Sequence, residues 1–224
     1  MTMTKKLFLS LFTLMVFGVG AQAQESDVHI SYDIEFITED SESPEMAMLS
    51  GSTMVLAFQD HHVAMDMQMG QMIGIRVAMD GEKRTGTMLM SMMGTNMAAN
   101  VSPEEYQELE DENAQVKTTI EKLDGKKKIL GYSCKRAKIT SQDGSVVTVW
   151  YTDKIKPNNL NSDMTSMYGD LDGFPLEMET MANNTPMVMT ATNIREAQDS
   201  DFEVEIPEGT QIMTYTQLKQ MGGN

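Results

Sequence analysis

Methionine is the residue whose number and spacing stand out, with 24 copies in 224 residues. Three sets of methionines occupy alternate positions: Met65, Met67 and Met69; Met88, Met90 and Met92; and Met187 and Met189. Since successive side chains of a strand point to opposite faces, each set lies on one face of its strand. The sequence therefore predicts a sheet face covered by thioethers, with Asp66 and Gln68 pointing the other way.

Three interpretations of this methionine face remain open. Methionine fills irregular gaps in an ordinary core because its side chain is unbranched and flexible. The same flexibility suits a deformable apolar cavity that accepts acyl chains or other apolar ligands of varied shape. Thioethers are also soft ligands suited to Cu(I), and two histidines are close in the sequence. The metal ligands would then be Met65, Met67, Met69, His61 and His62.

Few other residues are candidates for chemistry. The single cysteine, Cys134, rules out an intramolecular disulfide, a CxxC pair and a multi-cysteine zinc site. The sequence contains no HExxH, GxSxG, P-loop or GxGxxG motif. Asp170 to Glu179 partly matches a calcium loop, but Tyr168 occupies the first ligand position and Pro175 interrupts it. We therefore expect a protein that is not an enzyme, with no catalytic residue and no cofactor.

The charge balance excludes one class of partner. Lys and Arg number 17 against 33 Asp and Glu, a net charge of −16. Such a chain repels phosphate backbones, so we expect no nucleic-acid partner. Lys126-Lys127-Lys128 is a local basic run, interpreted as a solvated turn, with contact to anionic head groups as a minor alternative.

Residues 1–23 have the pattern of a secretory signal peptide. Lys5 and Lys6 precede an apolar run from Leu7 to Val19, and Ala21-Gln22-Ala23 forms a small-x-small cleavage pattern. We expect cleavage after Ala23 and a periplasmic or secreted protein, with residues 24–224 forming a single domain. After removal of the signal peptide no stretch is long and apolar enough to span a membrane. The oligomeric state is open, and a monomer is assumed.

Short alternating runs separated by turn residues predict a mostly β protein. Strands are expected at residues 28–37, 53–59, 62–69, 72–79, 87–93, 116–123, 132–140, 146–152, 176–181 and 187–197. Asp-Gly and Gly-x pairs between them, Asp124-Gly125 included, favour tight hairpin turns because glycine adopts positive φ at low cost. Residues 39–45 are expected to form a polar loop and residues 153–172 an irregular segment.

Two short helices are expected. Ser102 and Glu105 form a capping box with Pro103 at the first helical position, which predicts a helix over residues 103–112. Thr214 and Gln217 form a second capping box for a small helix after a run at residues 202–206. The predicted fold class is mostly β (α+β): a curved antiparallel sheet or half-open barrel of about ten strands with two short helices.

Three stretches resemble an exported Gram-negative family, the domain of unknown function 4412. They are Met88 to Gly94, Ile129 to Lys135 continuing to Val149–Thr152, and Leu171 to Glu177 continuing to Phe202–Gly209. The resemblance implies structural roles for the glycines, the cysteine and the tryptophan. The family in turn is similar to lipoprotein carriers and receptors of the Lol type. That similarity implies a Lol-like curved half-barrel, closed by helices, that holds acyl chains.

The sequence thus predicts a non-enzymatic envelope protein that binds a lipid, a lipoprotein acyl chain or another apolar ligand. The ligand cavity would be lined by the eight methionines of the three sets, and the helix near Tyr106 and Leu109 would act as its lid. A methionine-rich Cu(I)-binding protein and a structural or assembly partner with no ligand are the alternatives.

Overall fold

The computed structural model describes residues 27–38, 43–113, 117–157, 171–182 and 185–221. The N-terminal half contains β1 (Val28–Phe36), α1 (Pro44–Leu49), β2 (Thr53–Gln59), β3 (His62–Met69), β4 (Ile73–Asp80), β5 (Thr85–Met92), β6 (Thr95–Val101) and α2 (Pro103–Asn113). The C-terminal half contains β7 (Thr118–Ile129), β8 (Tyr132–Ser141), β9 (Val146–Thr152), β10 (Phe174–Ala182), β11 (Thr185–Arg195), the 3-10 helix η2 (Asp199–Phe202), β12 (Gln211–Thr214) and α3 (Tyr215–Met221).

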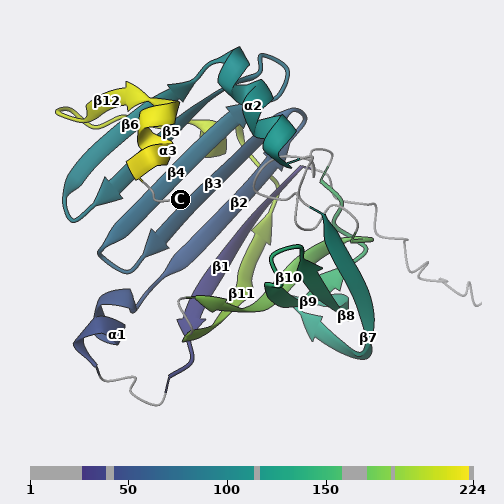
Figure 1. Cartoon of the computed structure of the whole chain (residues 1–224). Helices are drawn as coiled ribbons and strands as arrows, with labels where there is room; N and C mark the ends of the chain where they lie inside the picture. The colour runs from purple at the N-terminus through teal and green to yellow at the C-terminus, as the bar shows by residue number, and fades with distance from the viewer. Residues whose placement is uncertain (1–26, 39–42, 114–116, 158–170, 183–184, 222–224) are drawn as a thin grey trace, which may run out of the picture.

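All described strands belong to one curved, open sheet of twelve strands (Figure 1). Their order is β12-β6-β5-β4-β3-β2-β1-β11-β10-β9-β8-β7. Two antiparallel meanders, β1 to β6 and β7 to β11, meet where β1 pairs with β11. The only parallel pair in this order joins β12 to β6. The predicted fold class is therefore confirmed, although the strands number twelve rather than about ten.

The sheet curls so that side chains from its two halves meet on the concave face. The rings of Phe58 on β2 and Phe174 on β10 lie 5.4 Å apart, edge to face, although β1 and β11 separate their strands in the sheet. The Tyr32 hydroxyl donates a hydrogen bond of 2.8 Å to the backbone oxygen of Pro175. These contacts lie in the large apolar cluster, which also contains Ile30 and Leu176.

A second apolar cluster lies at the β6 end of the same face. Met97 and Val101 on β6 pack with Tyr215 and Leu218 of α3. In Figure 1, α3 lies over the strands at this end and α2 crosses their upper ends. Tyr106 of α2 packs against the same cluster. The two helices thus cover one end of the methionine-bearing face.

The segment after β11 covers part of the opposite face. Phe202 and Val204 pack against the small side chains of Ala57, Ala64 and Ala78 on β2, β3 and β4. Alanines leave space for another segment to approach the sheet closely. None of the helices in the described part of the chain combines the length and apolar character needed to cross a bilayer.

Several predicted elements need correction. Asp124-Gly125 is not a hairpin turn, because a register shift between Leu123 and Lys126 lets β7 continue to Ile129. The basic run at residues 126–128 is therefore strand rather than turn. Residues 202–206 end η2 and continue without a strand, and β6 and β12 were not predicted. The predicted signal peptide lies outside the described residues.

Residues 39–42 of the expected polar loop lie outside the described residues, and its last two residues begin a short helix, α1, that was not predicted. The Ser43 hydroxyl accepts a hydrogen bond of 3.3 Å from the Met46 backbone N–H. Ser43-Pro44 is the same start signal that predicted α2 from Ser102-Pro103. The sequence therefore contained the information needed for α1.

Candidate functional site

The predicted methionine sets on β3 and β5 share one face of the sheet, in register. Met67 lies opposite Ile75 on β4, which lies opposite Met90 on β5. One step along the strands, Met65 lies opposite Val77, which lies opposite Met88. Directly opposite residues of an antiparallel pair project from the same face. The outermost row of this face is Met69, Ile73 and Met92.

This face is only partly covered. Met65, Met67 and Met69 are half-buried against the large cluster, and Met88 and Met90 are half-buried against the second cluster. Met92 is 40% exposed. Apart from the buried Val77, the face between the two clusters is therefore apolar and partly accessible.

The third set lies elsewhere on the sheet. Met189 on β11 is opposite Ile34 on β1 and Met178 on β10, and Met187 is opposite Phe36. Strands β1 and β2 separate this set from β3. The structure thus places six of the eight predicted methionines on β3 and β5, the two strands that flank β4, and the other two on the far side of β1.

The histidines are not brought to the methionine face. Along β3, His62 alternates with Val63 and Met65, so it points to the opposite face. There it lies 3.5 Å from Asp80, and its ring is near that of Phe202. His61 is exposed in the β2–β3 turn. A copper site would therefore depend on thioethers without these histidines.

The predicted lid helix is positioned by its capping box. The Glu105 carboxylate accepts from the Ser102 backbone N–H at 2.9 Å, and the Ser102 hydroxyl accepts from the Glu105 N–H at 3.3 Å. Tyr106 and Leu109 then face the second cluster. The helix therefore borders the methionine face at its β6 end.

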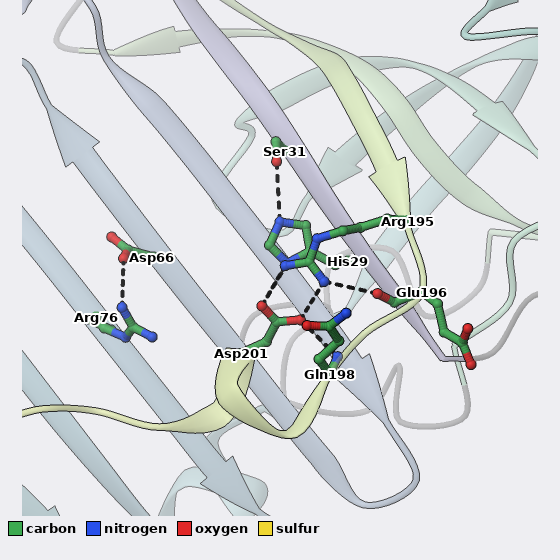
Figure 2. Close-up of polar contacts among 8 residues, drawn as sticks. All are labelled: His29, Ser31, Asp66, Arg76, Arg195, Glu196, Gln198 and Asp201. Atoms are coloured by element: carbon green, nitrogen blue, oxygen red, sulfur yellow. Dashed lines mark hydrogen bonds and ion pairs between the residues drawn. The ribbon is translucent and has the colours of Figure 1, made fainter.

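The opposite face holds a polar site that sequence analysis missed. Arg195, at the end of β11, forms two hydrogen bonds to the Asp201 carboxylate, at 2.6 and 2.8 Å (Figure 2). His29 Nδ1 lies 2.8 Å from the same guanidinium and 3.2 Å from Asp201. The Gln198 backbone N–H also donates to Asp201, at 2.9 Å. These contacts fasten the segment after β11 to the sheet.

Electrostatics favours a neutral imidazole in this arrangement. Burial lowers the pKa of His29, Asp201 opposes that shift, and the Arg195 cation lowers it further. Burial acts to raise the pKa of Asp201, but hydrogen bonds from Arg195 and Gln198 outweigh it and lower this pKa. Neutral His29 can then accept from Arg195 through Nδ1.

A cavity of about 480 Å³ opens beside this network. Its floor comes from β3, β4 and β5 and its wall from the segment after β11; the lining is Asp66, Gln68, Gly74, Arg76, Leu89, Ser91, Ser200, Glu203 and Glu205. The Arg76 guanidinium lies 3.4 Å from Asp66 (Figure 2), and Gln68 donates to Asp66 at 3.0 Å. The size and the converging polar groups suit a small polar ligand. The signal in the sequence that could have indicated this cavity is the set of polar residues that alternate with the methionines of β3.

The cysteine and the partial calcium loop form no catalytic or metal site in the described part of the chain. Cys134 is fully buried, and burial raises the pKa of its thiol, which makes it a poor nucleophile. Within the partial calcium loop, Asp172 pairs with Lys156 at 2.6 Å, while Tyr168 and Asp170 lie outside the described residues. No group of three or more His, Cys, Asp or Glu side chains that could hold a metal occurs among the residues described.

Several solved structures are similar in fold at low identity. PNGF-II, in a C2 crystal form, matches 87% of this chain and 32% of its own, at 15% identity and a TM-score of 0.46. A β-barrel-like protein of domain of unknown function DUF1849 from Brucella abortus matches 79% and 100%, at 9% identity and a TM-score of 0.38. The Mycobacterium tuberculosis lipoprotein LppX matches 78% and 89%, at 11% identity and a TM-score of 0.36.

The chain spans about a third of the PNGF-II chains it matches. No curated protein matches the sequence. A family model described as "N-glycanase peptide, N-terminal domain" matches residues 90–217, from the end of β5 into α3. This differs from the family suggested by the sequence resemblance. The match covers more than half of the sequence, so the chain belongs to the N-glycanase peptide N-terminal domain family.

Proposed function

We propose that this chain is a non-catalytic binding module that holds an acyl chain or a similar apolar ligand on the concave methionine face. One observation carries the proposal: the methionines of β3 and β5 lie in register on one face and are only partly buried. Leaving apolar side chains in contact with water is unfavourable, and a ligand that covers them recovers this hydrophobic free energy.

Methionine suits such a role better than branched residues. Its side chain has three rotatable bonds and a polarisable sulfur, so a methionine surface can repack around ligands of different shape. The apolar clusters on either side of this face hold its strands in place. The arrangement combines a fixed backbone with adaptable side chains.

The family supports an accessory rather than a catalytic role. Its description names an N-terminal domain, and the PNGF-II chains are about three times as long as the part this chain matches. The signal-peptide pattern of residues 1–23 supports an exported protein that works in the envelope or outside it.

Fluorescence titration with cis-parinaric acid tests the proposal. Met67→Gln and Met90→Gln keep the side-chain length but place an amide in the apolar contact, which costs free energy when buried without a partner. We expect each variant to bind the probe about tenfold more weakly than the wild type.

Met93→Gln is the matched control because Met93 is 84% exposed and lies in the β5–β6 turn. It should bind like the wild type. A wild-type protein that does not bind the probe, or Met67 and Met90 variants that bind it unchanged, would contradict the proposal. Stoichiometric uptake of Cu(I) without probe binding would favour the copper alternative.

The polar cavity favours a second candidate function, binding of a hydroxyl-rich ligand. Carboxylates, an amide, a guanidinium and serine hydroxyls line it, and such groups can hydrogen-bond to the hydroxyls of a sugar. The family description names an N-glycanase, which supports a glycopeptide as the ligand.

Calorimetric titration with an N-glycopeptide tests this second candidate. We expect Gln68→Ala to weaken binding about tenfold, because it removes an amide from the cavity floor. Gln107→Ala, on exposed α2, is the control. Binding that survives Gln68→Ala unchanged would place the glycopeptide elsewhere.

A further inference from the structure

Positive charge is concentrated in one part of this acidic protein. Residues 117–156 contain ten of the 17 Lys and Arg residues and four Asp and Glu, a local net charge of +6. The rest of the chain carries seven positive and 29 negative residues, a net charge of −22. Strands β7, β8 and β9 lie within this basic region, at the end of the sheet.

The lysines near the β7–β8 turn are arranged at a cost to stability. Lys126 lies directly opposite Lys135 in the register, where like charges repel, although Lys135 is itself paired with Asp153 at 2.7 Å. Lys126 and Lys128 are exposed and form no ion pair with any residue that the structure describes. Lys127 instead contacts Glu177 and stacks over the Trp150 ring. Two uncompensated cations therefore project from the end of β7, the outer strand in Figure 1.

An exposed leucine occupies the turn beside these lysines. Leu130 and Gly131 form the two-residue turn of the hairpin, with φ of 50° and 87°. Such turns favour Asn or Gly at the first position, because a bulky residue is strained at positive φ. The Leu130 side chain is also 46% exposed. An exposed apolar side chain in an unfavourable backbone conformation points to a function in binding.

We propose that the basic hairpin, defined by Lys126, Lys128, Leu130 and Lys135, docks on an anionic phospholipid surface. Lys126 and Lys128 would meet the lipid phosphates, and Leu130 would enter the boundary between head groups and acyl chains. The acidic remainder of the chain does not cancel this attraction, because salt screens charges beyond about 8 Å at physiological ionic strength.

Two alternative roles account for fewer features of the basic hairpin. Lysines on an edge strand discourage edge-to-edge aggregation of sheets. That role does not explain why an exposed leucine occupies a strained turn position at Leu130. An acidic protein partner would use the lysines, but the cavity of about 480 Å³ described above is lined by β3, β4, β5 and the segment after β11, away from this hairpin. A fluid anionic surface needs no preformed pocket. Membrane docking by the hairpin does not depend on the ligand proposed for the methionine face.

Vesicle flotation tests the proposal with the full chain. We expect binding to vesicles of phosphatidylcholine and phosphatidylglycerol at a ratio of roughly 7:3, little binding to pure phosphatidylcholine, and release by about 0.5 M NaCl. The double variant K126Q/K128Q should lower the partition coefficient about tenfold or more.

Leu130→Asn separates membrane docking from fold stability. Asparagine is favoured at this turn position, so thermal stability should be kept or raised, while vesicle binding should fall several-fold. K83Q/K219Q changes the net charge by the same amount as K126Q/K128Q at exposed sites outside the hairpin and should bind like the wild type.

The proposal would be overturned if the wild-type protein does not bind the anionic vesicles, or if K126Q/K128Q binds them as well as the wild type does. Unchanged binding by Leu130→Asn would also overturn it as stated. Binding of poly-L-glutamate without binding of vesicles would assign the hairpin to an acidic protein partner instead.

Discussion

Methionines with similar sequence surroundings have different environments in this sheet. Met178 on β10 is fully buried in the large cluster, whereas Met67 on β3 is half-buried on the accessible face. A truncation at Met178 leaves a cavity that its neighbours cannot fill, whereas solvent or a ligand can reach the space left at Met67. The two positions therefore separate methionine as core from methionine as binding surface.

Met178→Ala should lower the free energy of unfolding by about 3 kcal/mol. Met67→Ala should lower it by about 1 kcal/mol, because less apolar surface leaves water there on folding. Urea denaturation followed by circular dichroism measures both values. Equal losses at the two positions would show that the methionine face is packed core.

The Asp80 carboxyl group contributes to the stability of the fold in acid. Burial acts to raise its pKa, but hydrogen bonds from the Lys83 side chain and backbone N–H outweigh burial and lower the pKa to about 2. A carboxyl with a lowered native pKa stabilises the fold above its unfolded value of 3.8, and this contribution is lost as the pH falls toward 2.

Asp80→Asn should therefore remove part of the decline in stability between about pH 5 and pH 2, at a cost of about 1 kcal/mol near neutral pH. Urea denaturation at a series of pH values measures the effect. Asp33→Asn, at an exposed position of β1, is the control and should decline like the wild type. A wild-type acid profile in Asp80→Asn would contradict the assignment.

At the scale of elements, the sequence predicted those whose signals are local. Thr53–Gln59, His62–Met69 and Val146–Thr152 have the predicted bounds, because turn residues delimit alternating strands. β6 was missed because Ala98 and Ala99, buried side by side, interrupt the alternation. β12 was missed because four residues paired in parallel have no local pattern. The polar cavity joins β3–β5 to a segment more than 100 residues away, which sequence spacing does not reveal.

The second capping box is present as predicted. The Thr214 N–H donates to the Gln217 amide oxygen at 3.0 Å, and the Thr214 hydroxyl accepts from the Gln217 N–H at 3.2 Å. The helix it starts, α3, places Tyr215 and Leu218 on the second apolar cluster. Loss of this cap should therefore weaken the packing of α3 on the apolar cluster at β6.

Thr214→Ala should destabilise α3 by about 1 kcal/mol and speed amide hydrogen exchange there and in β12, with little change in β7 to β9. Hydrogen exchange with mass spectrometry gives both readings. Thr216→Ala, at an exposed position of the same helix, should leave exchange unchanged or slow it slightly. Uniformly faster exchange across the sheet would show that α3 does not open independently.

For the whole molecule, curvature depends on contacts between the two meanders. Phe174 is fully buried and meets Phe58 across the concave face. Phe202, also aromatic, is only half-buried and packs on the other face. Residues of the same type thus differ in whether they hold the two halves of the sheet together.

Phe174→Ala should cost about 4 kcal/mol and expose the large cluster, seen as binding of an apolar dye. Phe202→Ala should cost less than half as much and leave dye binding low, because the alanine cluster beneath it is small. Guanidinium denaturation and dye fluorescence measure the two effects. A smaller loss for Phe174→Ala than for Phe202→Ala would contradict the dependence of curvature on the contact between Phe58 and Phe174.

The pairing of β1 with β11, the seam that joins the two meanders, has a consequence for folding kinetics. His29 and Arg195, which meet across it, are 166 residues apart in the chain. Each meander is built from neighbouring strands and can pair locally, but the seam requires closure of a very long loop, and non-local pairing of this kind is slow. We therefore expect a nascent chain to remain without its completed sheet until β11 has been synthesised, with seam formation as the late step of folding.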